Sequence, residues 1–392
     1  MDHMVERHVS FASKFGYKVT EKEKSLPFMY WTPKCHKSPI GHRFIVASSN
    51  CSTKQLANDV SKAFRLVFNQ VRNFHEKSHF YSNFNQFWVV ENSTPILEKL
   101  KRCNLKRNAK SIDTFDFATL YTKIPHDKLV DTLIKVIDFT FKGGKKKFIA
   151  TATRTAFWTN KSSLGISKKD LKSIVEYLIT ECHFTVGNIV FTQDIGIPMG
   201  ISPAPFFANL FLQHYESIFM KTLMKNNVVE ARKFHGTYRF IDDLFTLNNN
   251  NVFGKLHHDI YPAELELKLE HSGTHATFLD LDISVENKMF VYKLFDKRDA
   301  FPFSIVRMPH FSSNIPSFIF YGAFKAEVLR VAKNTMRYCD FIPPLKALLQ
   351  RMINQGGLRK ALIRTIGNVF HKHMHHFASF EIHFMDLVRD LE

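Results

Sequence analysis

Two adjacent aspartates, Asp242 and Asp243, interrupt an otherwise apolar and aromatic stretch of the sequence between Tyr238 and Leu247. Short apolar runs on both sides of a polar turn predict a β-hairpin, and the alternation of side chains along strands then places the two carboxylates at its tip. A third carboxylate, Asp116, interrupts another β-prone run far upstream. If the two strands lie side by side, Asp116 and Asp242 face one cleft.

Carboxylates that share a cleft are suited to binding Mg²⁺, a hard cation that takes one or two carboxylates and completes its shell with substrate phosphates and water. Two such ions about 3.5 to 4 Å apart stabilise the attacking and the leaving oxygen of an in-line displacement at phosphorus. This is the chemistry of nucleotide addition, and Mn²⁺ could replace Mg²⁺ in it. Taken singly, Asp-Asp is also a common turn dipeptide, and Asp116 could simply end a strand.

Three segments, two of which contain these aspartates, follow one another in the order of the A, B and C motifs of reverse transcriptases. They are residues 116–127, 196–210 and 240–243. The sequence resembles the reverse transcriptases of Penelope-like retroelements, a branch that is similar to telomerase. The resemblance also covers residues 26–57 and continues downstream through 278–283 to 312–316, so it accounts for most of the chain.

The resemblance implies an α+β right-hand polymerase fold with an antiparallel-sheet palm, fingers and a helical thumb. Residues 1–110 would form fingers with a basic nucleotide-binding segment, and residues 111–295 the palm. A helical fingers insertion would occupy about 126–185. Residues 296–392 would form a basic, helical thumb, for which a helix-turn-helix DNA reader is the alternative.

The resemblance also implies the roles of individual residues near the metals. Asp116, Asp242 and Asp243 would be the catalytic and metal-binding carboxylates, and the backbone carbonyl of Phe117 a further ligand. Lys268 would be the general acid that protonates the leaving pyrophosphate. A primer 3′-hydroxyl, deprotonated with the help of one ion, would attack the α-phosphate of a deoxynucleotide whose triphosphate is held by the second ion.

Other residues would bind the nucleotide. Lys34, Lys37 and Arg43 would grip the triphosphate, because cationic side chains orient phosphate oxygens and offset their charge. Tyr121 would act as a steric gate that clashes with a 2′-hydroxyl, and Gly200 would permit close backbone approach in a loop that supports the template base and the sugar. Alternatively, the lysines and the arginine are ordinary exposed basic residues, Tyr121 is a core tyrosine, and the loop at Gly200 simply starts a helix.

Hydrophobic periodicity predicts the elements that position these residues. Helices are expected over 54–76, after Pro125, over 168–182 and from near Pro203, and a strand over 189–192. Two further aspartates, Asp280 and Asp282, are expected on the solvated face of a strand. Four histidines between 371 and 376 lack an accompanying carboxylate or cysteine pattern, which argues against a metal site there.

The charge balance agrees with a nucleic-acid partner. The 54 lysines and arginines against 36 aspartates and glutamates give a net charge of +18 and favour a polyanion whose counterions are released on binding. The expected partners are an RNA template, a DNA primer and dNTPs, without a membrane. The five scattered cysteines favour a reducing, intracellular compartment, and basic clusters such as 99–110 could serve either as nuclear addresses or as phosphate-contacting loops.

Nothing in the sequence supplies the GIY-YIG endonuclease that Penelope-like elements usually carry, so target cleavage is expected to be absent or to come from a separate partner. The sequence leaves the oligomeric state open, and it is compatible with a fragment or a degenerate copy of an element. The primary interpretation is an RNA-directed DNA polymerase. The alternatives are an RNA-dependent RNA polymerase and a catalytically silent, domesticated nucleic-acid-binding protein.

Overall fold

The computed structural model describes residues 1–35, 39–142, 148–162, 165–197, 200–303, 305–306 and 308–392. The chain divides into two compact units. The first consists of residues 1–90 and 115–270, and the second of residues 91–114 and 271–392. These units cut the chain differently from the three expected regions 1–110, 111–295 and 296–392. Those regions describe functional roles and stay predictions.

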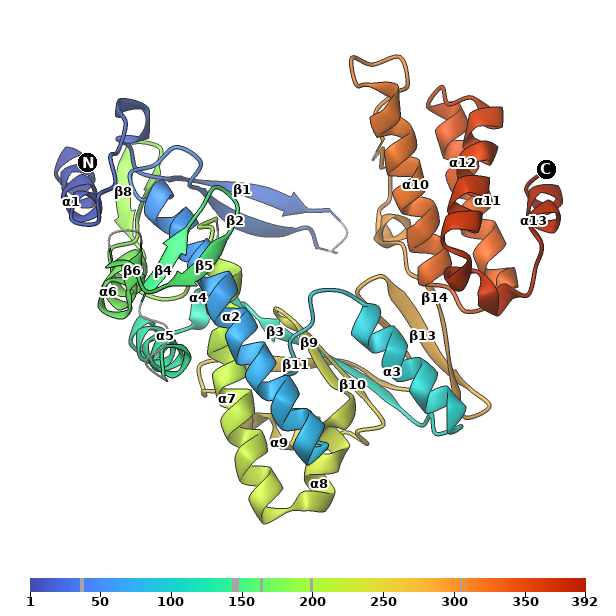
Figure 1. Ribbon diagram of the computed structural model, residues 1–392, viewed down its shortest axis with the longest axis horizontal. Coiled ribbons are helices and arrows are strands. Elements are labelled where there is room, and N and C mark those ends of the chain that lie inside the picture. Colours follow the sequence, from blue (N-terminus) through green and yellow to red (C-terminus); the bar gives the residue numbers. More distant parts are fainter. Residues whose placement is uncertain (36–38, 143–147, 163–164, 198–199, 304, 307) are drawn as a thin grey trace. The chain divides into compact units, whose positions relative to one another are not determined.

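A four-stranded sheet in the order β11-β3-β10-β9 carries the aspartates of interest (Figure 1). Its strands are β3 (Ile112–Ala118), β9 (Thr237–Phe240), β10 (Asp243–Leu247) and β11 (Glu266–Gly273). Strands β9 and β10 pair antiparallel with Asp243 opposite Phe240, which confirms the hairpin. Residues 112–114 of β3 and 271–273 of β11 are counted with the second unit.

Long helices of the first unit pack around one hydrophobic core. They are α2 (Lys54–Ser82), α5 (His126–Thr140), α6 (Lys168–Thr180) and α7 (Ala204–Asn226). Each presents an apolar stripe, such as Leu129, Leu133, Val136 and Ile137 on α5, to the shared cluster. All four predicted helices are confirmed, and α2 extends beyond the expected end at residue 76.

Two further sheets, one of four strands and one of three, contain the other strands of the first unit. One has the order β2-β1-β7-β8 and the other the order β5-β4-β6. The strands are β1 (Phe28–Lys34), β2 (Gly41–Ala47), β4 (Phe148–Thr151), β5 (Ala156–Thr159), β6 (Ile166–Ser167), β7 (His183–Val186) and β8 (Ile189–Thr192), the last as predicted. The short helices are α1 (Asp2–Ser13), α4 (Leu120–Lys123), α8 (Val228–Lys233) and α9 (Val252–Ile260).

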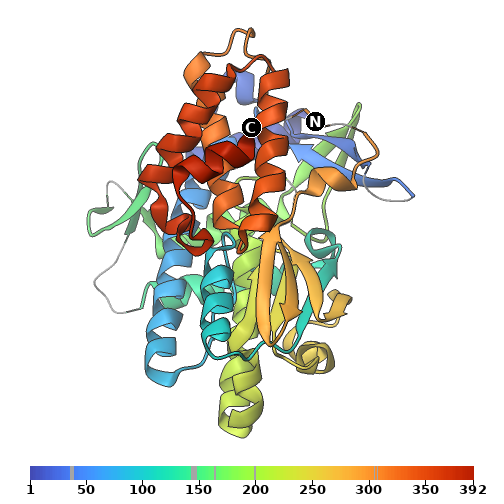
Figure 2. The ribbon, with the colours of Figure 1, turned by 90° about the vertical axis from the view of Figure 1, so that its right-hand side faces the viewer.

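The second unit joins a three-stranded sheet to helices. The sheet has the order β12-β13-β14 and consists of β12 (His275–Phe278), β13 (Leu281–Glu286) and β14 (Met289–Leu294). Helix α3 (Thr94–Leu105) packs on β14, where the Asn104 side chain bonds both backbone groups of Phe290 at 2.7 and 2.8 Å. Figure 2 shows the C-terminal helices, which share a second apolar core.

These C-terminal helices confirm the prediction that the last hundred residues are helical. They are α10 (Ser317–Lys333), α11 (Tyr338–Asn354), α12 (Arg359–Lys372) and α13 (Phe384–Leu391). The expectation that Asp280 and Asp282 share a solvated strand face holds only in part, because the Asp280 side chain is 50% exposed but lies outside the strand, and the Asp282 side chain is 20% exposed. Asp280 lies in the turn between β12 and β13, 3.3 Å from Arg330, and Asp282 is paired with His275 at 2.5 Å. Leu279, with φ 53°, ends the strand alternation that had placed both on one solvated face.

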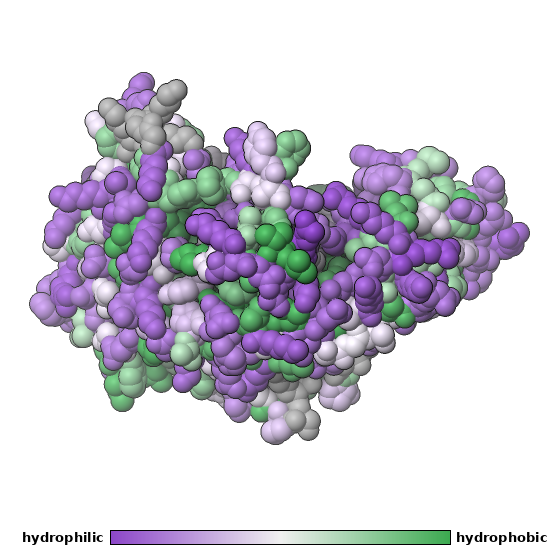
Figure 3. Space-filling view, turned by 90° about the horizontal axis from the view of Figure 1, so that it is seen from below, coloured by the Kyte–Doolittle hydropathy of each residue, from purple (hydrophilic) through white to green (hydrophobic). Residues whose placement is uncertain are grey.

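The surface agrees with the composition. Figure 3 shows one face of the molecule covered largely by hydrophilic side chains, with hydrophobic ones between them. No helix among the described residues is long and apolar enough to cross a membrane. All five cysteines, from Cys35 to Cys339, are free thiols.

Candidate active site

The structure places the two aspartate-bearing strands next to each other. Strands β3 and β10 are hydrogen-bonded neighbours, and the Phe117 amide donates to the Asp242 carbonyl at 3.3 Å. Asp116, Asp242 and Asp243 are each partly exposed to solvent, whereas Phe115 and Phe117 on both sides of Asp116 are buried. Polar side chains at the exposed positions of two adjacent strands can reach a common ligand.

The hairpin turns on a backbone conformation that its residue does not favour. Ile241, between the strands, has φ 56°, a left-handed value that is a genuine outlier for a β-branched side chain. Thr119, just after β3, has φ 59°. Such residues cost on the order of 1–3 kcal/mol each and persist where surrounding contacts hold them. Disfavoured backbone conformations therefore lie directly before Asp242 and shortly after Asp116.

The buried side chain of Arg239 hydrogen-bonds to the backbone of the β9–β10 turn. Its side chain is fully buried on the inward face of β9, and Nη1 donates to the Ile241 carbonyl at 2.9 Å. Further donors reach both oxygens of Asn209 on α7, at 2.9 and 3.2 Å. Backbone bonds to Trp88 and Val90, at 2.7 and 2.8 Å, fix the strand itself.

Glu216 on α7 balances the buried guanidinium. Its carboxylate accepts from Arg239 Nε at 2.5 Å and from Nη2 at 3.2 Å, and both side chains have no exposed surface. The Tyr261 hydroxyl also donates to Glu216, at 2.9 Å. Burial, followed by the Glu216 charge, raises the pKa of Tyr261 well above its usual range. The Tyr261 ring meets Phe117 edge-on at 4.9 Å, so the network touches both aspartate-bearing segments.

Tyr121 lies beside the carboxylates, in α4. Burial and then the Asp242 carboxylate raise the pKa of Tyr121 to about 12, while Arg239 acts in the opposite direction. The phenol is partly exposed, and its ring packs on the main core. The structure therefore brings Tyr121 and Asp242 into one electrostatic neighbourhood, and the role of Tyr121 as a steric gate stays a prediction.

Gly200 and Gly196 each lie against the backbone of a segment that is predicted to bind the nucleotide. A β-carbon at Gly200, where φ is 125°, would lie 1.8 Å from the carbonyl oxygen of Val46 on β2. A β-carbon at Gly196, where φ is 91°, would lie 2.3 Å from the Tyr121 carbonyl oxygen. The close backbone approach at Gly200 is to Val46 of the chain itself, and the predicted support of the template base and the sugar by this loop stays a prediction.

The β1–β2 hairpin contains Lys34 and Arg43, which are predicted to bind the triphosphate. Thr32 pairs with Arg43 and Lys34 pairs with Gly41, so strand alternation puts Lys34 and Arg43 on the same face of the hairpin. Arg43 is exposed. Lys37 falls outside the described residues.

Lys268 lies on β11, the neighbour of β3. Its side chain is 62% exposed, and its ammonium lies 3.3 Å from Glu266. Its role as a general acid stays a prediction.

The donor set fits a hard divalent cation that shares its shell with substrate. Asp116, Asp242 and the Phe117 carbonyl offer only oxygen atoms, the ligands that Mg²⁺ prefers. Among the described residues, no group of three or more His, Cys, Asp or Glu side chains is gathered to hold a metal ion. Metal binding by Asp116, Asp242, Asp243 and the Phe117 carbonyl stays a prediction.

Sequence reasoning missed Arg239, Glu216, Asn209 and Tyr261. The signal that could have found the first two is a charged residue at an apolar position. Arg239 is flanked by Tyr238 and Phe240 in a strand, and Glu216 follows the apolar stripe of α7. Their pairing across 23 residues has no local signal.

Comparison with solved structures identifies a shared fold. The chain is similar to telomerase from Candida albicans in complex with a TWJ fragment of telomeric RNA, with a TM-score of 0.53 and 13% identity, over 98% of this chain and 70% of that one. It is also similar to telomerase from Candida tropicalis with the same kind of fragment, with a TM-score of 0.52 and 12% identity, over 98% and 60%. No family model and no curated protein matches the sequence. The expected α+β architecture is therefore present, and the fold is telomerase-like.

Proposed function

We propose that the chain is an RNA-directed DNA polymerase of a Penelope-like retroelement, which adds deoxynucleotides to a primer 3′-hydroxyl. The observation that carries the proposal is the adjacency of β3 and β10, with Phe117 bonded to Asp242. The telomerase-like fold and the order of the three motifs support it. In this proposal the aspartate-bearing sheet is the palm, the β1–β2 hairpin belongs to the fingers, and helices α10 to α12 form the thumb.

The residues divide the work of one addition. The primer 3′-hydroxyl gives its proton to solvent water and its oxygen forms a bond to the α-phosphorus, while the bond from that phosphorus to the oxygen of the β-phosphate breaks and pyrophosphate leaves. Arg43 and Lys34 bind the triphosphate and hold it in line, which lowers the entropy cost of the reaction. Tyr121 packs under the sugar and excludes a 2′-hydroxyl. Arg239 and Glu216 position the turn without touching the substrate.

Two Mg²⁺ ions, bound by Asp116, Asp242 and the Phe117 carbonyl with phosphate oxygens, would supply charge neutralisation at the attacking and leaving oxygens. The carboxylates are partly exposed at the surface, which leaves room for a substrate that brings ligands of its own. RNA template and DNA primer would be held by the basic surface that the net charge of +18 provides.

Primer extension tests the proposal. The purified chain is given Mg²⁺, a DNA primer on an RNA template, and either dNTPs or NTPs. We expect extension with dNTPs, loss of extension in Asp242→Ala, and full extension in Asp259→Asn, which changes an exposed carboxylate at the end of α9.

The rival functions give different results. A catalytically silent binding protein would bind the duplex with a steep salt dependence but show no extension under any metal. An RNA-dependent RNA polymerase would extend the primer with NTPs in preference to dNTPs. Equal extension by the wild-type chain and Asp242→Ala would contradict the assigned site.

A further inference from the structure

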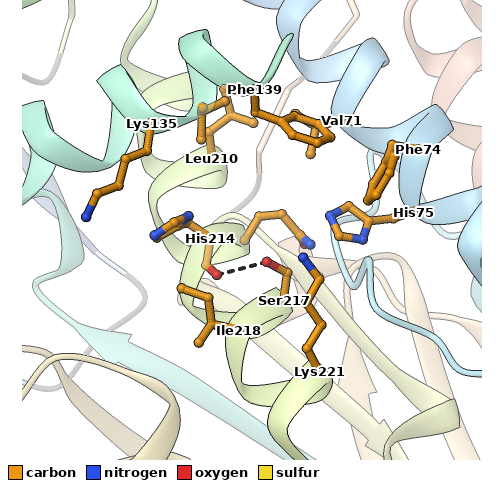
Figure 4. Close-up of a pocket in the computed structure, with 12 residues that line it drawn as sticks. Val71, Phe74, His75, Lys135, Phe139, Leu210, His214, Ser217, Ile218 and Lys221 are labelled. Atoms are coloured by element: carbon orange, nitrogen blue, oxygen red, sulfur yellow. Dashed lines mark hydrogen bonds between the residues drawn. The ribbon is translucent and has the colours of Figure 1, made fainter. Parts of the chain in front are cut away.

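A cavity of about 180 Å³ lies between α2, α5 and α7 of the first unit. Figure 4 shows its lining. Its walls are apolar, with Val71 from α2, Phe139 from α5 and Leu210 from α7. The function proposed above does not use it. Cavities lined by apolar side chains with a few convergent polar groups are the usual form of a small-molecule site.

Two buried polar atoms in the lining lack partners. His75 is 5% exposed and Gln213 1% exposed. Within the described part of the chain, His75 Nδ1 and Gln213 Oε1 have no hydrogen-bond partner. The Gln213 amide nitrogen is satisfied, because it donates to the Gln86 carbonyl at 2.7 Å. Enclosed polar atoms are almost always satisfied by protein, water or ligand, so two at one cavity indicate an occupant.

A lysine side chain, Lys221, also lines this cavity. In Figure 4 the Lys221 side chain reaches from α7 toward His75, whereas Lys135 points away. Burial and then the Lys221 charge lower the pKa of His75 to about 4, so the imidazole is neutral at pH 7 and offers one N–H. Lys135 is engaged by Asp131 on its own helix at 2.6 Å. Lys221 is therefore the cation that can serve the cavity.

We propose that this cavity binds a small aromatic carboxylate. The ring fills the space between Val71, Phe139 and Leu210. The carboxylate accepts hydrogen bonds from Lys221 and from the His75 N–H, and Lys221 donates a further hydrogen bond to Gln213 Oε1. This arrangement satisfies both orphaned polar atoms and balances the cation.

The size of the cavity limits the ligand to about one ring. A cavity of about 150 Å³ lined by apolar side chains holds benzene, so about 180 Å³ accommodates a ring with a short acidic arm. A fatty acid or a nucleotide base with its sugar exceeds this space. Phenylacetate is a suitable probe.

Calorimetric titration of the full chain with phenylacetate tests the proposal. Acetate, which lacks the ring, and phenylacetamide, which lacks the charge, are titrated beside it. We expect saturable binding of phenylacetate, no saturable binding of acetate, and binding of phenylacetamide that is weaker by about tenfold or more because the charged hydrogen bonds are lost. Bound phenylacetate should also raise the melting temperature, since it binds only the native state.

A pair of variants isolates the cation. Lys221→Gln should weaken phenylacetate binding about tenfold. Lys225→Gln changes an exposed lysine on the same helix outside the cavity and should leave the affinity unchanged. Both substitutions are at exposed positions, so folding is preserved. Absence of saturable phenylacetate binding by the wild-type chain, or equal affinity in Lys221→Gln, would overturn the proposal and leave water as the occupant.

Discussion

The turn between β9 and β10 is built around a buried ion pair, whereas the C-terminal helices pack around an apolar cluster. Beneath the turn, Arg239 and Glu216 have no exposed surface and hold Ile241 at a positive φ. In α10 to α13, by contrast, the buried side chains among the described residues are all apolar, and Phe341 among them has no exposed surface. The turn therefore combines buried charge with a disfavoured backbone conformation, whereas the departure from a local rule in α11 is a different one, because Pro343 and Pro344 lie inside the helix.

This difference separates a region selected for position from one selected for stability. Buried ion pairs are weak stabilisers compared with apolar packing of the same volume, because desolvation offsets the attraction. A turn that has a disfavoured backbone conformation and is held by a buried ion pair therefore contributes little to the free energy of unfolding. Departures of this kind are expected at functional sites. Substitutions in each region test whether the two regions differ in this way.

The largest effect is expected from Asp242→Asn at the tip of the turn. Loss of a metal-binding carboxylate should lower the rate of primer extension about a thousandfold or more, because the ions supply several kcal/mol in the transition state. The melting temperature should stay nearly constant, since Asp242 is partly exposed. Single-turnover kinetics and calorimetry measure the two quantities, and a large loss of stability in this variant would blur the distinction between the regions.

Glu216→Gln should reduce both stability and activity. The Arg239 charge stays buried without its counter-ion, which costs about 3 to 5 kcal/mol of unfolding free energy. Denaturant titration measures this cost.

A triple variant, Arg239→Met, Glu216→Met and Tyr261→Phe, distinguishes a positioning role from a structural one. Removing the whole network should recover stability, because well-packed apolar replacements of a buried pair are often neutral. Activity should stay low, because nothing then holds the Ile241 carbonyl. Full recovery of activity would show that the network serves stability alone.

Phe341→Ala in α11 is the counterpart in the helical cluster. The ring is fully buried, so its removal should cost about 3 to 5 kcal/mol through lost burial and a cavity. Phe341→Leu should cost distinctly less. At low temperature, where the protein stays folded, the rate of nucleotide addition should be nearly unchanged in both variants.

The pH dependence of unfolding should reflect His75 in the first unit. Its pKa is lowered to about 4 by burial and then by Lys221, against 6.5 in the unfolded chain. The unfolded state binds more protons between these values, so the contribution of His75 is complete above pH 6.5 and is lost as pH falls toward 4, by on the order of 3 kcal/mol. In His75→Phe the denaturation midpoint should depend less steeply on pH, and an unchanged slope would remove this assignment.

The smallest effect is expected from Tyr121→Ala. Loss of the ring should improve incorporation of ribonucleotides relative to deoxynucleotides by about ten- to hundredfold, because the clash with the 2′-hydroxyl disappears. Competition between dNTPs and NTPs in the primer-extension assay measures the ratio. No change in this ratio would assign Tyr121 to the core instead.

Regular elements could be predicted from the sequence because their signals are local. Helix α5 follows Pro125 with apolar residues at helical spacing, and the β9–β10 hairpin follows from two short runs around Asp242. The pairing of Arg239 with Glu216 could not be predicted, since it depends on the approach of α7 to β9 in three dimensions. The turn at Asp280 was missed because Leu279 adopts a positive φ that its residue type disfavours.

Direct measurement of metal binding tests the central claim, that Asp116 and Asp242 converge on divalent cations. Mn²⁺ serves as a paramagnetic substitute, titrated into the full chain with primer, template and a non-hydrolysable dNTP and followed by electron paramagnetic resonance. We predict two bound ions in the wild-type chain and in Asp259→Asn, and loss of both in the double variant Asp116→Asn, Asp242→Asn. Unchanged stoichiometry and affinity in the double variant would contradict the account.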